Sequence, residues 1–197
     1  GAVYLASGAE GLAAVLGSAR PRDLALAALR EALWDAGLYE PRTVDAAYRR
    51  VAVEVFLALP DPGAPWAARG AVEDVREGAL SARLLDAAGS RVTAVPGAQA
   101  AGLVALEAAA ARLLSGEIDV ALVGGMDDLL SAAAIEDLDR RSKLRTSRAA
   151  GGLIPGEGSA FLVLERADGA AKRGAAPLAS VVATGRGREA VVLDGPE

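Results

Sequence analysis

Apolar and polar positions follow two periods along the chain, one typical of helices and one typical of strands. From residue 21 to residue 36, apolar side chains recur on one broad face, and Gly37 suits the C-terminal cap of that helix. Between residues 51 and 58, valine and leucine alternate with other residues, which predicts a strand with one well-buried face. The continuous apolar run at 120–123 predicts a strand with both faces covered.

The rest of the pattern extends this alternation of strands and helices. Further strands are expected at residues 2–6, 91–95, 161–164 and 178–184, further helices at 66–89, 100–114, 131–138 and around 172–173, and a turn at 39–43. Alternating strands and helices imply a mixed, mainly parallel sheet with helices on both faces. We therefore predict an α/β fold in a single domain that spans residues 1–197.

The stretch from residue 92 to residue 130 organises this fold. It reads as a buried strand, a turn that contains glycine, a helix of small residues and a second buried strand that ends in paired glycines. In many α/β enzymes a nucleophile stands at such a turn, where the free N–H groups of the helix favour negative charge. Here the turn carries Gln99, and the chain contains no cysteine or histidine.

Composition narrows the possible functions. The net charge of −5 argues against a general nucleic-acid role, because phosphate binding needs a concentrated basic surface. A membrane span is not expected, since no run of about 18 uncharged apolar residues occurs. No signal peptide is recognisable, so we expect a cytoplasmic protein. The absence of cysteine and histidine leaves carboxylates, lysine, tyrosine and hydroxyls for any catalysis, and no cofactor or metal is expected.

Several motifs resemble the N-terminal half of the β-ketoacyl-acyl carrier protein synthases, which have the thiolase-like fold. They occur in the family's order at residues 24–38 (LALAALREALWDAGL), 102–106 (GLVAL), 115–125 (SGEIDVALVGG), 155–165 (PGEGSAFLVLE) and 171–175 (AKRGA). Together they extend over nearly the whole chain. The resemblance implies a ketosynthase-like α/β domain.

The same resemblance assigns a role to the turn at Gln99. When the family's Leu-Val-Ala-Leu sequence is laid on residues 103–106, its nucleophilic cysteine falls at Gln99. Chain-length factors and decarboxylating loading synthases carry glutamine there. The implied acyl pocket consists of Ala98, Gln99, Ala100 and Leu153. The Gln99 amide either hydrogen-bonds a thioester carbonyl of the ligand or satisfies helix-terminal N–H groups.

The family's two catalytic histidines, its conserved lysine and half of its oxyanion hole lie in a C-terminal half that the resemblance does not reach. It therefore implies a non-catalytic pseudo-synthase of fatty-acid or polyketide synthesis, a partner subunit similar to chain-length factors. One alternative is a 3-oxoacyl synthase half that transfers acyl groups only together with a C-terminal half. Another is a module that binds acyl-pantetheine without reacting.

Two surfaces are candidates for partners. In relatives the strand before the nucleophile pairs with its twin, so Val92, Thr93, Ala94 and Val95 are expected to form the edge of a homodimer or of a heterodimer with a ketosynthase subunit. The only dense basic cluster, which we call the basic segment, consists of Arg140, Arg141, Lys143, Arg145 and Arg148. It either docks an acidic acyl carrier protein by charge complementarity or forms a solvated loop.

Two other groups are interpreted as structural. Gly156, Glu157 and Gly158 form a tight turn, where glycines permit positive φ and close backbone approach and Glu157 anchors the turn. The acidic residues Asp127, Asp128, Glu136, Asp137 and Asp139 are read as a solvated face and a helix entry rather than a metal site.

Overall fold

A computed structural model describes residues 19–59, 71–86, 90–146 and 151–187. Its centre is a sheet of four strands, β1 (Val53–Leu59), β2 (Ser90–Pro96), β3 (Val120–Asp128) and β4 (Glu157–Glu165), in the order β2-β1-β3-β4. Strands β1, β2 and β3 are parallel to one another, and β4 runs antiparallel to β3. The predicted mixed, mainly parallel sheet is confirmed.

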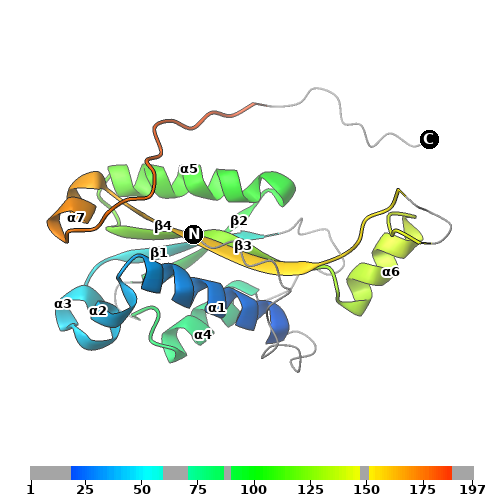
Figure 1. The fold of residues 1–197 in the computed structure, drawn as a ribbon, viewed down its shortest axis with the longest axis horizontal. Helices are drawn as coiled ribbons and strands as arrows, with labels where there is room; N and C mark the ends of the chain where they lie inside the picture. The colour runs from blue at the N-terminus through cyan, green and yellow to red at the C-terminus, as the bar shows by residue number, and fades with distance from the viewer. Residues whose placement is uncertain (1–18, 60–70, 87–89, 147–150, 188–197) are drawn as a thin grey trace.

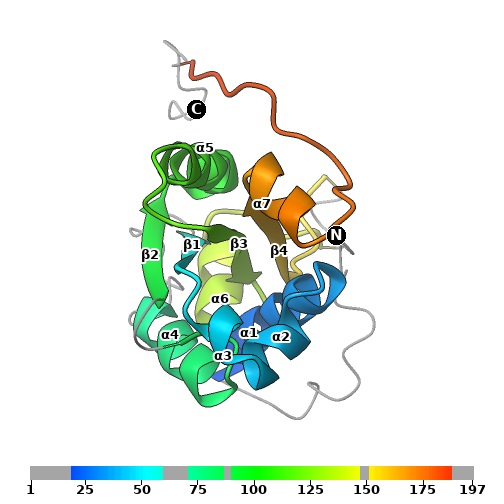
Figure 2. The same ribbon diagram turned by 90° about the vertical axis from the view of Figure 1, so that its left-hand side faces the viewer.

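Helices cover both faces of this sheet (Figure 1). Helices α1 (Ala19–Asp35) and α4 (Ala71–Ser81) pack on one face, and α5 (Ala101–Leu114) lies across the other, where Figure 2 shows it end-on with α7 (Ala167–Lys172) on the same side. Shorter helices complete the described fold: α2 (Tyr39–Val44), α3 (Ala46–Arg49), the 3-10 turn η2 (Ala98–Ala100), α6 (Ala132–Arg140) and α7 (Ala167–Lys172). None of the described helices is long and apolar enough to cross a membrane.

The two faces of the sheet carry separate apolar cores. On the face of α1 and α4, leucines such as Leu29 and Leu33 pack against Val55 and Leu57 of β1. Beneath α5 the core is smaller, and the alanines of that helix allow its backbone to approach Phe56 of β1 closely. The sequence predicted one buried face for β1, which is wrong. Residues Val53–Leu57 are all buried because α5 covers the second face.

Most elements lie where the apolar pattern predicted them. The helix expected at 21–36 is α1, and Gly37 ends it with a φ of +68°, a conformation that glycine adopts without strain. The prediction of a turn at 39–43 is wrong, because helix α2 occupies this segment. Helix α3 follows it and is capped by Asp45, whose side chain accepts a hydrogen bond from the backbone N–H of Ala47. The strand expected at 2–6 lies outside the described residues.

The prediction of a last strand at residues 178–184 is also wrong. This segment has no strand pairing, and Val182 within it is 96% exposed. Strand β4 therefore forms one edge of the described sheet. Further along, Arg186 forms an ion pair with Glu107 of α5, so the segment runs toward that helix rather than along β4. Strand propensity alone, without pairing to a neighbouring strand, does not produce a strand.

Candidate functional site

The turn that carries Gln99 joins the edge strand β2 to the central helix α5. It is a single 3-10 turn, η2, closed by a hydrogen bond from the N–H of Ala100 to the carbonyl of Gly97. A side chain at Gly97 would contact the Cα of Ala101 at 3.0 Å, so a residue without Cβ lets the chain turn sharply here. The sequence prediction of a sharp turn between a strand and a helix is confirmed.

Gln99 is exposed at this turn. The residue that caps α5, Ala100, offers no side-chain hydrogen bond, and the side chain of Gln99 bonds to none of the described residues. One of the two interpretations of Gln99 required its amide to satisfy the N–H groups at the start of the helix. No such bond is present among the described residues, so the amide of Gln99 is available to a ligand, while the 3-10 turn η2 already uses the N–H of Ala100.

The carboxyl ends of the parallel strands meet at the edge of the sheet where Gln99 lies, because Leu59 of β1 stands in register with Pro96 of β2. Strand β3 continues past its neighbour β1 to Asp128, beyond the end predicted at residue 123. Asp127 belongs to this extension. Desolvation raises the pKa of its carboxyl, a hydrogen bond from the N–H of Asp128 opposes this shift, and the charge of Asp128 adds to it.

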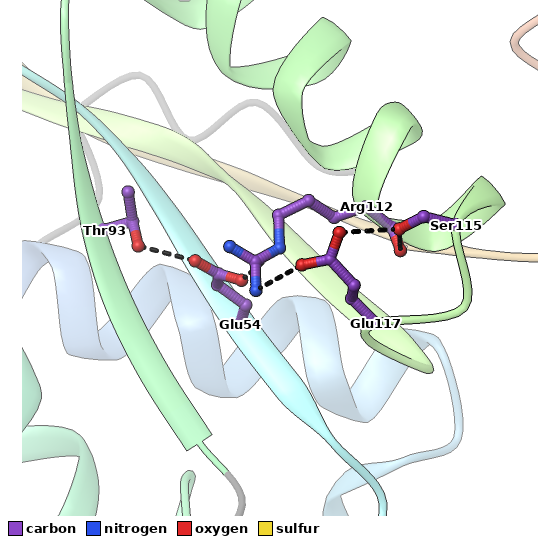
Figure 3. A network of polar contacts seen from close by, with 5 residues as sticks. All are labelled: Glu54, Thr93, Arg112, Ser115 and Glu117. Atoms are coloured by element: carbon purple, nitrogen blue, oxygen red, sulfur yellow. Dashed lines mark hydrogen bonds and ion pairs between the residues drawn. The ribbon is translucent and has the colours of Figure 1, made fainter.

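A buried ionic network fixes helix α5 above the sheet (Figure 3). Glu54 of β1 is 1% exposed, accepts a hydrogen bond from Thr93 at 2.5 Å and lies 3.2 Å from Nε of Arg112 on α5. Arg112 also pairs with Glu117, which accepts a hydrogen bond from the hydroxyl of Ser115. The network joins strands β1 and β2 to the C-terminal end of α5, the helix whose first residue follows the turn of Gln99.

The sequence interpretation missed Glu54, because the alternation of β1 placed it on a face read as less buried. A signal was present in the sequence: Glu54 is the only acidic residue of an apolar strand, and Arg112 is the only basic residue of an apolar helix. Two isolated opposite charges in elements predicted to pack together indicate an ion pair, since a buried charge must be paired.

The basic segment begins with Arg140, the last residue of helix α6, and is bonded to the rest of the protein at two places. The carboxylate of Asp137, 1% exposed, binds Arg140 at 3.2 Å and Arg141 at 2.8 Å. Farther on, a short parallel bridge joins Leu144 to Leu153, with the N–H of Arg145 donating to the carbonyl of Leu153. The guanidinium groups remain more than half exposed, and Arg148 lies outside the described residues.

The other predicted site residues are distributed as follows. Ala98 belongs to η2, and Leu153 is 45% exposed at the bridge with Leu144. Strand β2, with Val92–Val95, forms the second edge of the described sheet, opposite β4. Glu157 and Gly158 begin β4, while Gly156 has an ordinary φ and accepts a bond from Leu129. Among the described residues, no group of three or more acidic side chains could hold a metal ion.

Comparison with known proteins gives a consistent result. The model of the β-ketoacyl synthase N-terminal domain matches residues 20–170. Comparison with curated proteins found no match. Three solved structures illustrate the similarity in fold. The ketosynthase from module 6 of the bacillaene synthase of Bacillus subtilis 168 superposes with a TM-score of 0.56 at 23% identity, covering 78% of this chain and 28% of that one.

A β-ketoacyl synthase from Burkholderia phymatum STM815 gives a TM-score of 0.57 at 23% identity, over 80% of this chain and 44% of its own. A type II polyketide ketosynthase was solved with its acyl carrier protein and bound to the hexaketide. It gives a TM-score of 0.51 at 23% identity, covering 75% of this chain and 46% of its own. The chain thus spans less than half of the length of each of these structures.

Proposed function

Because the chain belongs to the β-ketoacyl synthase family through its N-terminal domain, we propose that it is a non-catalytic subunit of fatty-acid or polyketide synthesis. In this role it resembles a chain-length factor: it supplies the fold and the acyl-facing turn but forms no acyl-enzyme bond. The proposal rests on the family membership together with the residue at the turn before α5.

The observation that carries the proposal is the exposure of the Gln99 side chain and its lack of a hydrogen-bond partner among the described residues. Gln99 stands in the 3-10 turn that leads into a 14-residue helix. An amide can donate to or accept from a thioester, but it does not attack one, because only thiol, hydroxyl, amine, imidazole and carboxylate side chains serve as nucleophiles. The free N–H groups of α5 would in turn bind the carbonyl oxygen of such a ligand.

A partner subunit is part of this proposal. The outer edge of β2 is free among the described strands, and a free edge is able to pair with another chain. We place a homodimer, or a heterodimer with a ketosynthase subunit, along Val92–Val95. For an acyl carrier protein the docking surface is the basic segment, in which Asp137 already neutralises part of the charge of Arg140 and Arg141. Lys143 and Arg145 are exposed and carry the remainder within the described part.

One observation favours the alternative of an acyltransferase half that requires a second half. On the side of the sheet covered by α5, three large apolar side chains are exposed: Leu103 by 74%, Leu114 by 80% and Leu162 by 53%. A second half that packs along α5 and β4 would remove these three side chains from water. A complementary half that carries histidines and packs there would supply catalytic groups that this chain lacks.

Native mass spectrometry of the complex purified from the source organism separates these functions. A partner that is a full-length ketosynthase with its own cysteine supports the non-catalytic subunit. A partner that is a histidine-bearing C-terminal half supports the acyltransferase alternative. A chain that forms neither complex, and that shows the same acyl-pantetheine affinity with Gln99→Ala as without it, contradicts both the partner role and the ligand role of Gln99.

A further inference from the structure

A second candidate site lies at the opposite end of the sheet from Gln99. It is a cavity of about 500 Å³ at the amino ends of β1 and β3, between the α2–α3 segment and helix α7. Figure 2 looks onto this end of the molecule, with α7 on one side and α2 and α3 on the other. Its volume lies within the range of about 300–1,000 Å³ that is usual for sites of small molecules.

The lining of this cavity is strongly basic although the chain is acidic. Five cationic side chains line it, Arg42, Arg50, Arg166, Lys172 and Arg173, against two acidic ones, Asp119 and Glu165. The whole chain carries a net charge of −5, so this excess of positive charge is local and opposes the overall balance. Several cations that converge on one concave surface raise the local concentration of anions.

Two of the arginines form a fixed wall of the cavity. Arg42, 4% exposed, donates hydrogen bonds to the carbonyls of Leu84 and Tyr48 and to the hydroxyl of Ser90, all of them neutral acceptors. Burial lowers the pKa of its guanidinium and the charge of Asp86 opposes this shift, yet an arginine keeps its proton. Arg173 is held by Glu165 at 2.8 Å and donates to the carbonyl of Ala36.

Two of the other cations, Arg50 and Lys172, are available to a ligand. Arg50 is exposed and forms no ion pair within the described part of the chain. Lys172 lies 3.6 Å from the carboxylate of Asp168 with 78% of its side chain exposed, whereas Arg166 binds both oxygens of that carboxylate. Asp119 accepts a hydrogen bond from the N–H of Ala52 through one oxygen and keeps its negative charge, so it offsets part of the positive charge of the lining. The cavity therefore presents more cationic donors than carboxylates that could neutralise them.

From this arrangement we propose that the cavity binds a small molecule through a phosphate group. A dianionic phosphate suits the site because an arginine fork binds two of its oxygens at once and a lysine adds a point charge. Leu38, Tyr48 and Val51 line the same cavity and provide an apolar wall for the remainder of the molecule. The site is separate from the turn at Gln99, so it does not depend on the function proposed above.

Isothermal titration calorimetry of the full chain with pyrophosphate, inorganic phosphate and adenosine diphosphate tests the proposal. We expect pyrophosphate to bind, with an affinity that falls as sodium chloride is added. Tighter binding of adenosine diphosphate would show that the apolar wall contacts the rest of the ligand. Binding of pyrophosphate alone would show that the site takes a free polyphosphate. Absence of binding by all three compounds at millimolar concentration overturns the proposal.

Substitutions of the cationic side chains test whether pyrophosphate binds in this cavity. Arg50→Gln should weaken pyrophosphate binding by about tenfold, and Arg50→Gln combined with Lys172→Gln by about a hundredfold, as the loss of one or two charge-assisted hydrogen bonds requires. Both side chains are exposed, so circular dichroism and thermal melting should match the unchanged protein. Arg30→Gln, at an exposed position of α1, is the matched control and should leave the affinity unchanged. An equal loss in this control, or no loss in the first two variants, also overturns the proposal.

Discussion

The Nε atom of Arg112 on helix α5 lies 3.2 Å from the carboxylate of Glu54 on strand β1, and this is the contact that ties the central helix to the sheet. The glutamate is 1% exposed and the arginine 29% exposed. A buried carboxylate keeps its place only while its partner compensates for the lost hydration. This pair therefore contributes, together with the apolar core beneath α5, to holding the C-terminal end of the helix on the sheet.

Arg112→Ala should lower the free energy of unfolding substantially. Removing the arginine leaves Glu54 buried with only its hydrogen bond from Thr93, and losing one partner of a buried pair costs about 3–5 kcal/mol. We expect the lower end of that range, because Arg112 is partly solvated. Urea denaturation measures the change.

The matched control for this prediction is Arg76→Ala. Arg76 forms an ion pair with Glu73 on helix α4, and both side chains are about half exposed. Its loss should change the stability by less than about 1 kcal/mol. Equal effects of the two substitutions would show that the pair of Glu54 and Arg112 contributes no more than a surface contact.

A side chain at Gly124 of β3 should lower the stability of the fold, because strand β4 lies very close to this position. A Cβ at this position would lie 2.0 Å from the carbonyl oxygen of Ala160 and 2.6 Å from the ring of Phe161, both on β4. Gly124→Ala must therefore separate β3 from β4 or displace a buried ring, which should cost about 3 kcal/mol. Thermal unfolding of the variant checks this value.

Gly102→Ala is the comparison for the glycine in the strand. A Cβ at Gly102 of α5 would have no other atom within 4 Å, and alanine favours a helix over glycine by up to about 1 kcal/mol. This variant should therefore melt at the same temperature as the unchanged chain or higher. If both alanine variants lowered the melting temperature alike, the close approach of β3 and β4 at Gly124 would be refuted.

Local sequence patterns were sufficient to predict most of the helices and strands. The amphipathic spacing of α1 and the apolar run of β3 each carry their structure in a few adjacent residues, so their positions follow from the sequence. The failures concern features that depend on distant partners. Both faces of β1 are buried only because α5 packs over Glu54 and Phe56, which no local pattern records. The segment 178–184 has the residues of a strand but does not pair with the open edge at β4, and the chain instead runs on to the ion pair of Arg186 with Glu107 on α5.

At the candidate site too, features set by adjacent residues were predicted and features that depend on distant residues were not. Motif order was sufficient to place Gln99 at the start of a helix after a strand, because the turn is a local feature. The capping state of that helix was not predictable, since it depends on whether the amide folds back onto the N–H groups or points away. The basic cavity was missed as well. Lys172 is far from Arg42 and Arg50 in sequence, and only the fold brings them together.

Asp127 should give stability a dependence on pH. Its pKa is raised in the folded state, so the neutral carboxyl is favoured by folding, and this contribution is lost as the pH rises through the folded pKa. Asp127→Asn keeps an oxygen that can accept from the N–H of Asp128 and removes the charge. The variant should be more stable than the unchanged chain at pH 7.

The gain from Asp127→Asn should disappear as the pH falls below about 4, where the carboxyl of the unchanged chain is also neutral. Urea midpoints measured from pH 3 to pH 8 follow both proteins. A constant difference across this range would mean that the substitution acts through packing and not through the charge.

The central claim is that Gln99 occupies the position of a nucleophile at the N-terminus of α5. The chain has no cysteine, so Gln99→Cys introduces a single thiol whose pKa can be read from the pH dependence of its alkylation rate. The matched control is Ser81→Cys, at an exposed position in the last turn of α4, where the helix dipole has the opposite sign.

We predict that the thiol at position 99 has a pKa clearly below the usual value of about 8.5, and that the thiol at position 81 has a pKa at or above it. Equal pKa values at the two positions, or a higher value at position 99, would contradict the claim.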